Sequence, residues 1–487
     1  MRRTQSEDGI AMVMAVGILV VLGMLAIAVT AYTTAGQRTA SRSSAGVSAY
    51  SLAEAGINNA MAVLAKPRSA LDATLLWPPR TTLYDSGSVR WWGTLPTGSS
   101  TWTVTSIGTM RNPTGGSQPV RRKISVSVRV RPSFMQPTNN PAWNYIIATR
   151  TSTPKGCDQS LNNSVNIQSP MYVLGNLCLN TPSQITGGPL QVHGSMKLDV
   201  NTNVGSSGVP LNELHVRNGC SYKNGAFVLP QDGGCVPAQK VWTTVADASP
   251  ITLELPTADY PSWYVNSAPG PRQACTTQSG TVPVFDNNAI WDSSVGGVFN
   301  LTPSASDYSC VVQSGNKVVG ELSWNHTAKT LAIVGTVFID GSVTVNYGYQ
   351  NVPILYTGTG TIYVGGTFLF HNTQLCATIT AAGDTCDFPH WDPNSTFLVI
   401  VADGDGGQVP VGDSIQLVSS SFEGGLFAKN AIELDTHSKT EGPMFSGNVI
   451  MDNTVFAQTW PLVTVPVGMP GTIITDAPPD APSDFSG

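Results

Sequence analysis

The most constraining feature of this sequence is an uncharged apolar run close to its N-terminus. From Ile10 to Tyr32 the chain reads IAMVMAVGILVVLGMLAIAVTAY, without a charged residue. About 20 apolar residues in a helix are enough to cross the hydrocarbon core of a bilayer. A cleaved secretory signal has a shorter apolar region, of roughly 7–15 residues. The run therefore predicts a membrane-spanning helix.

The orientation of this helix is only weakly indicated by its flanking charges. Arg2 and Arg3 precede the run, whereas Arg38 and Arg42 follow it, so the positive-inside rule is nearly balanced. Cysteines and strand-like segments all lie after the run, and disulfides form outside the cytoplasm. We therefore expect a short N-terminus inside and an exported bulk.

The helical pattern continues well beyond the apolar run. Residues 33–66 contain no proline, and apolar or small residues recur at helical spacing until Pro67. One helix over 10–66 would be about 85 Å long, much longer than a bilayer is thick. Ala45, Ala49 and Ala53 recur four residues apart, which permits close approach of another helix. The pattern alone leaves open a filament helix or a plain membrane anchor.

Two short motifs resemble those of type IV prepilins and of the PilX-like group of minor pilins. Glu7-Asp8-Gly9-Ile10 resembles the prepilin processing site, where a hydrophilic leader ends in Gly before a long apolar helix. Ala53-Glu54-Ala55-Gly56 resembles the AEAG segment of PilX-like pilins. The resemblance covers roughly residues 1–66. It implies that a prepilin peptidase cuts after Gly9 and that Ile10 becomes the mature N-terminus.

The resemblance also implies how such a chain would assemble. Major pilins carry a Glu at the fifth mature position, where this chain has Met14. A carboxylate is costly in lipid and is kept there only for a function, so its absence indicates a minor subunit. The implied partners are the inner membrane, where the chain is first a single-pass protein, and then other pilin subunits at the cell surface. The helix residues expected to carry assembly are Ile10, Met14, Ala45, Ala49, Ala53, Glu54 and Gly56.

Alternating residues after the helix predict a small antiparallel sheet. Ser100–Gly108 and Arg122–Val130 each alternate apolar and polar residues, and Asn112-Pro113-Thr114-Gly115-Gly116 between them is a turn signal. The resemblance implies that such a sheet packs on the helix, whose stripe from Ala49 to Leu64 would meet its apolar face.

The remaining sequence repeats a strand–bend–strand theme. Short alternating runs broken by Gly or Asn recur from about residue 171 to residue 456. This spacing favours a right-handed parallel β-helix, in which each coil stacks on the preceding one; a β-sandwich is the alternative. The segment 205–330 fits poorly and is expected to be an irregular insertion. The predicted fold class is therefore α+β, mainly β.

The expected domain organisation follows from these patterns. It comprises a leader (1–9), a transmembrane and filament helix (10–66), a pilin-like sheet (67–135), a β-rich exported domain (140–465) and a flexible tail (466–487).

Eight cysteines indicate disulfides in the exported part. Eight cysteines allow 105 pairings, and we expect sequential local pairs. These pairs are Cys157–Cys178, Cys220–Cys235, Cys275–Cys310 and Cys376–Cys386.

Motifs for catalysis are lacking in this sequence. The six histidines are scattered, and no GxSxG elbow or P-loop is present, so we expect no enzyme. Asp403 and Asp405 form a weak calcium candidate, and no other cofactor is indicated. The net charge of −6 gives no support for a nucleic-acid surface.

These patterns together lead to one functional hypothesis and three alternatives. The hypothesis is a minor pilin-like subunit of a type IV pilus or related filament, which presents a β-rich domain for assembly priming or for adhesion to a surface or glycan. The alternatives are a type II secretion pseudopilin, a membrane-anchored polysaccharide-active β-helix enzyme, and an adhesin that does not polymerise. The enzyme alternative requires a pair of carboxylates in one groove.

Overall fold

The computed structural model divides the chain into two compact units. Unit 1 comprises Met1–Val130 with Pro478–Gly487, and unit 2 comprises Arg131–Ala477. The structure describes residues 7–65, 74–96, 101–130, 135–137, 140–151, 156–222, 227–228, 235, 240–258, 273–277, 297–301, 307–314, 317–339, 341–346, 353–404, 414–459, 461–466, 468–471 and 482–486.

Unit 1 begins with one long helix, α1, from Glu7 to Leu64. The described chain contains no proline in this stretch, and threonine hydroxyls bond back to carbonyls of the preceding turn, as Thr33 does to Val29 at 2.9 Å. The expected helix over 10–66 is thus confirmed as one element, although Lys66 lies outside the described residues.

The second half of α1 packs on a five-stranded antiparallel sheet in the order β1-β2-β3-β4-β38. The strands are β1 (Arg80–Tyr84), β2 (Gly87–Thr94), β3 (Thr101–Met110), β4 (Val120–Arg129) and β38 (Ser483–Ser486). Alternation places Val104, Ile124 and Val126 in the core against the helix. β3 and β4 coincide closely with the two strands predicted from the sequence.

A short strand lies within the expected flexible tail of 466–487. Ser483–Ser486 forms β38, which pairs antiparallel with β4 opposite Ser125 and Ser127. Polar residues that alternate poorly gave no strand signal here. Unit 2 is consequently an insertion in the sequence of unit 1, between β4 and β38.

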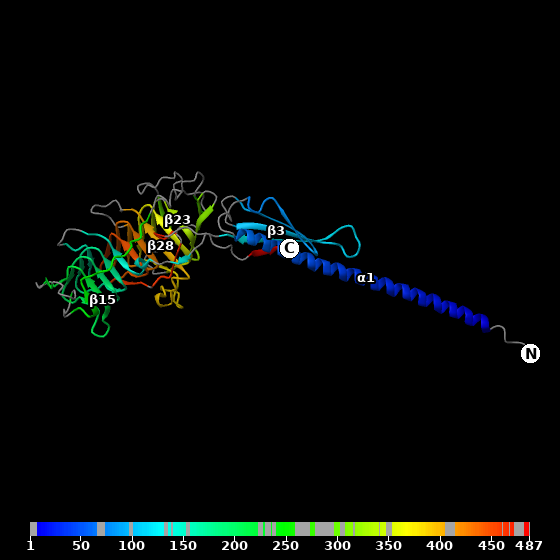
Figure 1. The fold of residues 1–487 in the computed structure, drawn as a ribbon, viewed down its shortest axis with the longest axis horizontal. Helices are drawn as coiled ribbons and strands as arrows, with labels where there is room; N and C mark the ends of the chain where they lie inside the picture. The colour runs from blue at the N-terminus through cyan, green and yellow to red at the C-terminus, as the bar shows by residue number, and fades with distance from the viewer. Residues whose placement is uncertain are drawn as a thin grey trace, which may run out of the picture. The chain divides into compact units, whose positions relative to one another are not determined.

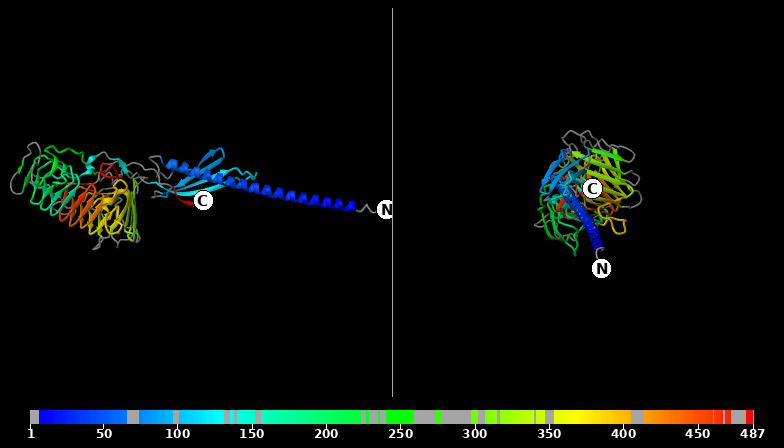
Figure 2. Two further views of the ribbon diagram at one scale, coloured as in Figure 1. Left: turned by 90° about the horizontal axis from the view of Figure 1, so that it is seen from below. Right: turned by 90° about the vertical axis from the view of Figure 1, so that its right-hand side faces the viewer.

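Unit 2 consists of short strands that pair mainly in parallel and nearly close on themselves, as a parallel β-helix does (Figures 1 and 2). This pairing rules out the β-sandwich alternative, whose strands are antiparallel. One sheet contains, in spatial order, β17 (Phe227–Val228), β16 (Cys220–Tyr222), β13 (Met196–Leu198), β10 (Leu177–Leu179), β7 (Gln159–Leu161), β35 (Asn448–Met451), β32 (Ala431–Asp435), β29 (Ile415–Val418), β26 (Phe368–His371), β24 (Gly341–Asn346) and β20 (Gly297–Leu301).

The second sheet of unit 2 combines two faces of the solenoid. Its strands are β6 (Ile146–Ala148), β8 (Asn166–Gln168), β9 (Met171–Val173), β11 (Gln184–Ile185), β12 (Leu190–Val192), β14 (Asn203–Val204), β15 (Leu211–Val216), β18 (Thr243–Asp247), β19 (Gln273–Thr277), β21 (Tyr308–Ser314), β22 (Lys317–Asn325), β23 (Thr330–Ile339), β25 (Pro353–Val364), β27 (Gln374–Cys376), β28 (Phe397–Ala402), β30 (Ser421–Glu423), β31 (Gly425–Ala428), β33 (Lys439–Glu441), β34 (Met444–Ser446) and β36 (Phe456–Gln458). Outside both sheets lie η1 (Pro141–Asn144), η2 (Phe388–His390) and a two-stranded ribbon of β5 (Met135–Pro137) and β37 (Thr464–Pro466).

The coils of this solenoid do not stack in sequence order. The chain enters in the middle at β6 and builds coils toward β16 and β18, after which the coils from β23 and β24 onward build back toward the middle. The two series meet at a seam, where β35 pairs with β7, β36 with β8 and β34 with β6. Figure 1 shows this order as a green end, an orange middle and a yellow end. The expectation that each coil follows the one before is therefore wrong at the seam.

A buried polar side chain links the two series of coils at the seam. Gln159 on β7 is fully buried, and its amide bonds both the N–H and the carbonyl of Val449 on β35. A buried amide whose donor and acceptor both have partners is stable in a core, whereas an unpaired one is costly. One side chain thus joins two strands that are 290 residues apart in sequence.

The corners of the β-helix carry left-handed backbone conformations. Asn163, Asn201, Asn372 and Asn453 all have positive φ angles, which Asn tolerates better than most residues. The sequence prediction that Asn takes bends agrees with these four positions.

The region 205–330 is only partly described. β15 and β18 extend the parallel ladder, whereas β19, β21, β22 and β23 pair antiparallel in series. The described part of the expected irregular insertion therefore contains several regular strands, alongside segments without regular structure.

Candidate assembly helix and surface groove

The N-terminal half of α1 has no partner within the described chain. Its most apolar stretch of 18 residues has a mean hydropathy of 2.9, and no residue of that stretch is buried. Large apolar side chains point outward here, among them Ile10 at 63% exposure and Met14 at 68%. A bare apolar helix of this length is stable only in lipid or against other apolar helices, so this half defines the first candidate site.

The Gly9–Ile10 junction lies in the first turns of the helix. The backbone there is helical from Glu7 onward, and the side chains of residues 7–9 lie outside the described set. Gly17, four positions beyond Val13, faces open space and serves as a comparison position in tests of Gly9.

The alanine stripe packs on the chain's own sheet, as expected for the stripe from Ala49 to Leu64, although the same alanines were also expected to carry subunit assembly. Ala45, Ala49 and Ala53 are buried against the chain's own sheet. A Cβ on Gly108 of β3 would overlap the carbonyl oxygen of Ala49 and lie 2.7 Å from the nitrogen of Ala53. Small residues here allow the helix to approach its own β3, so this stripe is not available to a neighbouring subunit.

The AEAG segment divides between two faces of α1. Ala53 is buried, and a Cβ on Gly56 would overlap the hydroxyl of Ser106, whereas Glu54 is exposed. Sequence reasoning missed the exposed apolar residues of this half, Val47 at 67% and Tyr50 at 43% exposure. Val47 and Tyr50 fall between the positions of the buried stripe, so they lie on another face of the helix. This position is the signal that could have identified them.

Three of the four expected disulfides are present. Cys157–Cys178, Cys220–Cys235 and Cys376–Cys386 have Cα atoms 5.6, 5.2 and 5.2 Å apart. For the fourth pair, Cys275 and Cys310 stand directly opposite in the β19–β21 ladder, and the side chain of Cys275 lies outside the described residues. This fourth disulfide remains a prediction.

The calcium candidate is only half described. Asp403 is almost fully buried and pairs with Lys429, whose Nζ lies 2.9 Å from its carboxylate, and Asp405 lies outside the described residues. Within the described part of the chain no group of three or more His, Cys, Asp or Glu could hold a metal ion.

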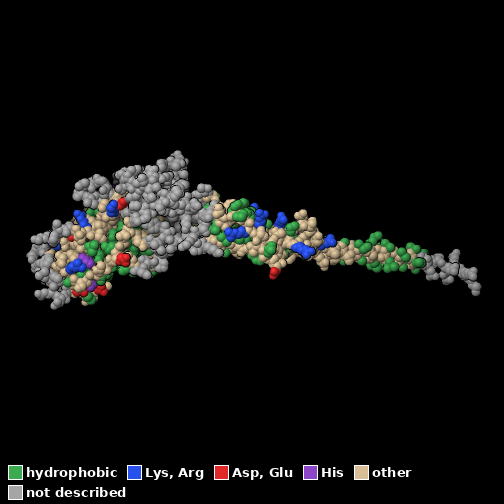
Figure 3. Space-filling model, turned by 45° about the horizontal axis from the view of Figure 1, so that its top comes forward, with side chains coloured by type: hydrophobic (Ala, Val, Ile, Leu, Met, Phe, Trp, Pro, Cys, Tyr) green, Lys and Arg blue, Asp and Glu red, His purple; other side chains and the backbone are tan. Residues whose placement is uncertain are grey.

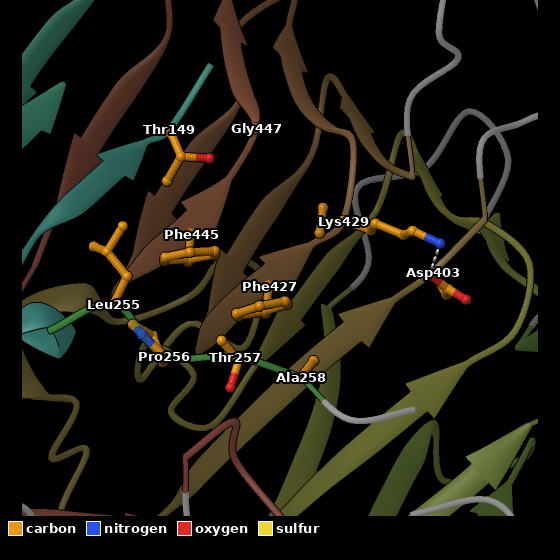
Figure 4. A pocket seen from close by; sticks show the side chains of 11 residues that line it. Thr149, Leu255, Pro256, Thr257, Ala258, Asp403, Phe427, Lys429, Phe445 and Gly447 are labelled. Atoms are coloured by element: carbon orange, nitrogen blue, oxygen red, sulfur yellow. Dashed lines mark ion pairs between the residues drawn. The ribbon is translucent and has the colours of Figure 1, made fainter. Parts of the chain in front are cut away.

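A groove on the outer face of unit 2 forms the second candidate site. It has a volume of about 620 Å³ and is mainly apolar, within the usual range for ligand pockets. Phe427 of β31 and Phe445 of β34 are neighbours in register and form its floor, with centroids 4.6 Å apart and planes within 6°. Figure 4 shows both rings edge-on, with Lys429 and Asp403 at one end.

The phenylalanines of the groove belong to a column of apolar side chains that runs along the outside of the β-helix. Phe427 aligns with Val401 on one side, and Phe445 with Ile147 and then Tyr172 on the other. Tyr172 and Ile147 are covered by Leu253 of the extended segment 247–258, which we call the strap. The strap ends beside the groove, where Leu255, Pro256, Thr257 and Ala258 line one wall.

The stacked rings limit what this groove can bind. Because each phenylalanine uses a face against the other, mainly ring edges remain for a ligand. A sugar normally stacks on an open aromatic face, so this floor suits an apolar group with a polar end near Lys429. Among the described lining residues, two carboxylates occur neither in this groove nor in a second one of about 540 Å³ near Asn372, Gln374 and Lys439.

The strap is held by one histidine and one amide side chain. Gln191 Oε1 accepts from the Ile251 nitrogen at 3.0 Å, and His193 Nε2 lies 3.0 Å from the Ile251 carbonyl. Arg217 can only donate, so its contact of 3.0 Å to Nδ1 of His193 places the histidine proton on Nε2. Burial and the nearby Arg217 lower the pKa of His193, which favours this neutral form.

One carboxyl in unit 2 is buried close to a disulfide loop. Glu423 is fully buried, and its Oε2 accepts from the backbone N–H groups of Ala377 and Thr378 at 2.7 and 2.9 Å. Burial raises the pKa of Glu423 to about 7, although the two N–H bonds lower it in part. Glu441 is its neighbour in register and is 1% exposed. This carboxylate pair is buried in the solenoid, where a polymeric substrate cannot contact it.

Comparisons with known proteins leave the family open. No family model matches the chain, and no curated protein matches it. Among solved structures, the competence-associated pilin ComZ from Thermus thermophilus matches with 13% identity and a TM-score of 0.39, over 91% of this chain and 97% of that one. A TM-score of this size does not establish a shared fold, so the function is argued from the chain's own residues.

Proposed function

We propose that this protein is a minor pilin-like subunit of a type IV pilus or a related filament. It would be made as a single-pass inner-membrane protein, cut after Gly9 by a prepilin peptidase, and inserted into the filament through the N-terminal half of α1. The β-helical unit would then be presented for assembly priming or adhesion. No step requires catalysis by this chain itself.

The observation that carries this proposal is the division of α1. The half from Ile10 to Tyr32 is apolar and bare, whereas the half from Ala45 to Leu64 is packed on the sheet. A plain anchor satisfies its apolar surface permanently in lipid. A filament subunit needs the same surface to pass from lipid to neighbouring helices, and the prepilin-like junction at Gly9–Ile10 would provide for that release.

The structure also suggests which surfaces neighbours would contact. The alanine stripe is occupied by the sheet, so we assign subunit contacts to the bare apolar half, together with Val47 and Tyr50. Met14 is 68% exposed and contributes an apolar contact instead of a charge pair. A subunit that cannot form the charge pair of major pilins suits a minor position, and membership of the PilX-like group remains part of this proposal.

The direct test is incorporation into filaments. In the producing cell, a tagged chain should appear in the sheared filament fraction, whereas Gly9→Ala should remain in the membrane. The matched control is Gly17→Ala, which also adds one methyl group, into open space, and should behave as wild type. A wild-type chain found wholly in the membrane would contradict the proposal. Normal filaments combined with a secretion defect on deletion would favour the type II pseudopilin alternative instead.

A further inference from the structure

Basic residues of unit 1 gather at the end of the sheet that lies toward the bare half of α1. Arg38 and Arg42 are exposed on the helix just before its packed half. Arg122 at the start of β4 lies against the same helix, because a Cβ on Gly46 would be 3.3 Å from its guanidinium. The set, here called the basic collar, comprises Arg38, Arg42, Arg111, Arg121, Arg122 and Lys123.

The collar occupies one side of the helix. Arg38, Arg42 and Gly46 are four residues apart in sequence, so they lie on one face, the face that carries Ala49 and Ala53 against the sheet. The turn between β3 and β4 runs alongside α1 toward its N-terminal half in Figures 1 and 2. Figure 3 shows basic side chains spread along unit 1 as far as the start of the bare half of α1, and far fewer acidic ones.

This arrangement leaves a surplus of positive charge at one end of the sheet. Like charges four residues apart destabilise a helix, and positive charge after a membrane span also opposes its export. Asp85 lies in the turn between β1 and β2 at this end of the sheet, and Glu54 on α1 and Asp484 on β38 lie farther along unit 1, so the six collar residues outnumber the acidic residues described near them. An anionic partner from outside the unit would offset the repulsion between these charges.

The distance to the membrane identifies that partner. If the hydrocarbon core ends near Tyr32, Arg38 lies about 9 Å beyond it, Arg42 about 15 Å and Gly46 about 21 Å. The headgroup layer adds several ångströms on each side of the core, and long basic side chains extend toward it. A modest helix tilt toward the sheet would bring the β3–β4 turn closer as well.

We propose that the basic collar docks unit 1 on the surface of an anionic bilayer before the chain leaves the membrane. Arg38 and Arg42 bind lipid phosphates directly, while Arg111, Arg121, Arg122 and Lys123 add attraction over roughly one Debye length. Docking fixes the rotation of α1 about its long axis. The helix face that carries Arg38 and Arg42 then always lies on the side where unit 1 contacts the lipid headgroups. The proposal requires the membrane span, but neither processing after Gly9 nor polymerisation.

The test uses the full chain in nanodiscs that hold one copy each. Hydrogen exchange of the β3–β4 turn, from Met110 to Lys123, is compared in discs of phosphatidylcholine alone and in discs that also contain phosphatidylglycerol. Exchange should be about fivefold slower in the anionic discs, and about 0.5 M NaCl should abolish the difference because it screens the charges.

Variants identify the residues responsible. Arg38→Gln with Arg42→Gln removes two charges from an exposed helix surface without touching the sheet core, and should abolish the protection in anionic discs. Arg80→Gln with Arg129→Gln removes the same charge from positions farther along the sheet and should retain it. Equal exchange in both lipids at low salt would overturn the proposal. Protection that requires two copies in one disc would also overturn it, since the collar would then bind a second chain.

Discussion

Units 1 and 2 differ in how far each satisfies its own apolar surface. In unit 2 the core residues are buried by other coils of the same solenoid, and even the outer apolar column is partly covered by the strap. In unit 1 the same chain leaves more than twenty consecutive helical residues uncovered, from Ile10 to Tyr32 and beyond. The difference indicates that unit 2 is complete as a folded body, whereas unit 1 is complete only with lipid or with other helices.

The largest effect is expected where α1 meets its own sheet. Gly108→Val would drive a side chain into the backbone of Ala49 and Ala53, which cannot move aside as a flexible side chain would. Unit 1 should lose about 3 kcal/mol or more of unfolding free energy, while unit 2 stays unchanged. Calorimetry of the full chain in detergent should show a lower unfolding temperature for unit 1 and an unchanged one for unit 2.

The matched control for this variant is Gly36→Ala. A Cβ there meets nothing within 4 Å, and Ala is a better helix former than Gly. The Gly36 variant should therefore be as stable as wild type or slightly more so. Loss of both transitions in Gly108→Val would contradict the independence of the two units.

A charge in the bare half of α1 should have an effect nearly as large. It should impair insertion of the helix into the membrane and leave the folding of the two units intact. Leu19 is 68% exposed, and Arg at the centre of a span costs about 3 kcal/mol on insertion scales. Leu19→Arg should shift the chain out of the membrane fraction while unit 2 stays folded. Val47→Arg, at a similarly exposed site outside the span, should insert normally. Equal insertion of both variants would show that the bare half does not enter lipid.

The buried carboxyl of Glu423 gives unit 2 a pH-dependent stability. Its pKa is raised from 4.5 to about 7, so the folded state binds the proton more tightly than the unfolded state does. Stability should rise as pH falls through 7, and the gain should be complete below about 4.5. The shift corresponds to at most about 3 kcal/mol.

Urea unfolding of the full chain between pH 8 and pH about 4.5 measures this effect. Glu423→Gln keeps an oxygen acceptor for the N–H groups of Ala377 and Thr378 and should flatten the profile of unit 2. Glu254→Gln changes an exposed residue of the strap and should leave the profile as in wild type. A wild-type profile that falls toward acid throughout this range would show that Glu423 does not govern it.

The smallest expected effect belongs to the disulfide beside that carboxyl. Cys376 and Cys386 are 10 residues apart in sequence, and closing a short loop typically contributes about 2 kcal/mol. Replacing both by Ala should lower the stability of unit 2 by about that amount and leave unit 1 unchanged. Non-reducing peptide mapping of the wild type would also show whether Cys275 pairs with Cys310, as their opposed positions predict.

The elements that could be predicted from the sequence are those set by local pattern. An uncharged run without proline specifies α1, and alternation specifies β3 and β4, because each signal lies within one segment. The pairing Cys157–Cys178 agrees with the expected sequential pairs, but its reason appears only in the structure: Cys178 lies on β10, which pairs with β7, just after Cys157.

The features that could not be predicted depend on contacts distant in sequence. The seam joins Gln159 to Val449, and no local pattern shows that coils made so far apart are neighbours. Phe427 and Phe445 become a stacked floor only once the register of β31 and β34 is known. The alanine stripe was predicted to permit close approach, which is correct, but small size does not indicate whether a neighbouring helix or the chain's own sheet makes that approach.

The central claim is that the bare half of α1 belongs to a processed filament subunit, and the mature N-terminus tests it most directly. The full chain, made together with its own prepilin peptidase, would be measured by intact mass and N-terminal sequencing beside Gly9→Ala and Gly17→Ala. The account predicts that wild type and Gly17→Ala begin at Ile10, whereas Gly9→Ala keeps the leader. A wild-type chain that keeps residues 1–9 would contradict it and leave α1 as a membrane anchor only.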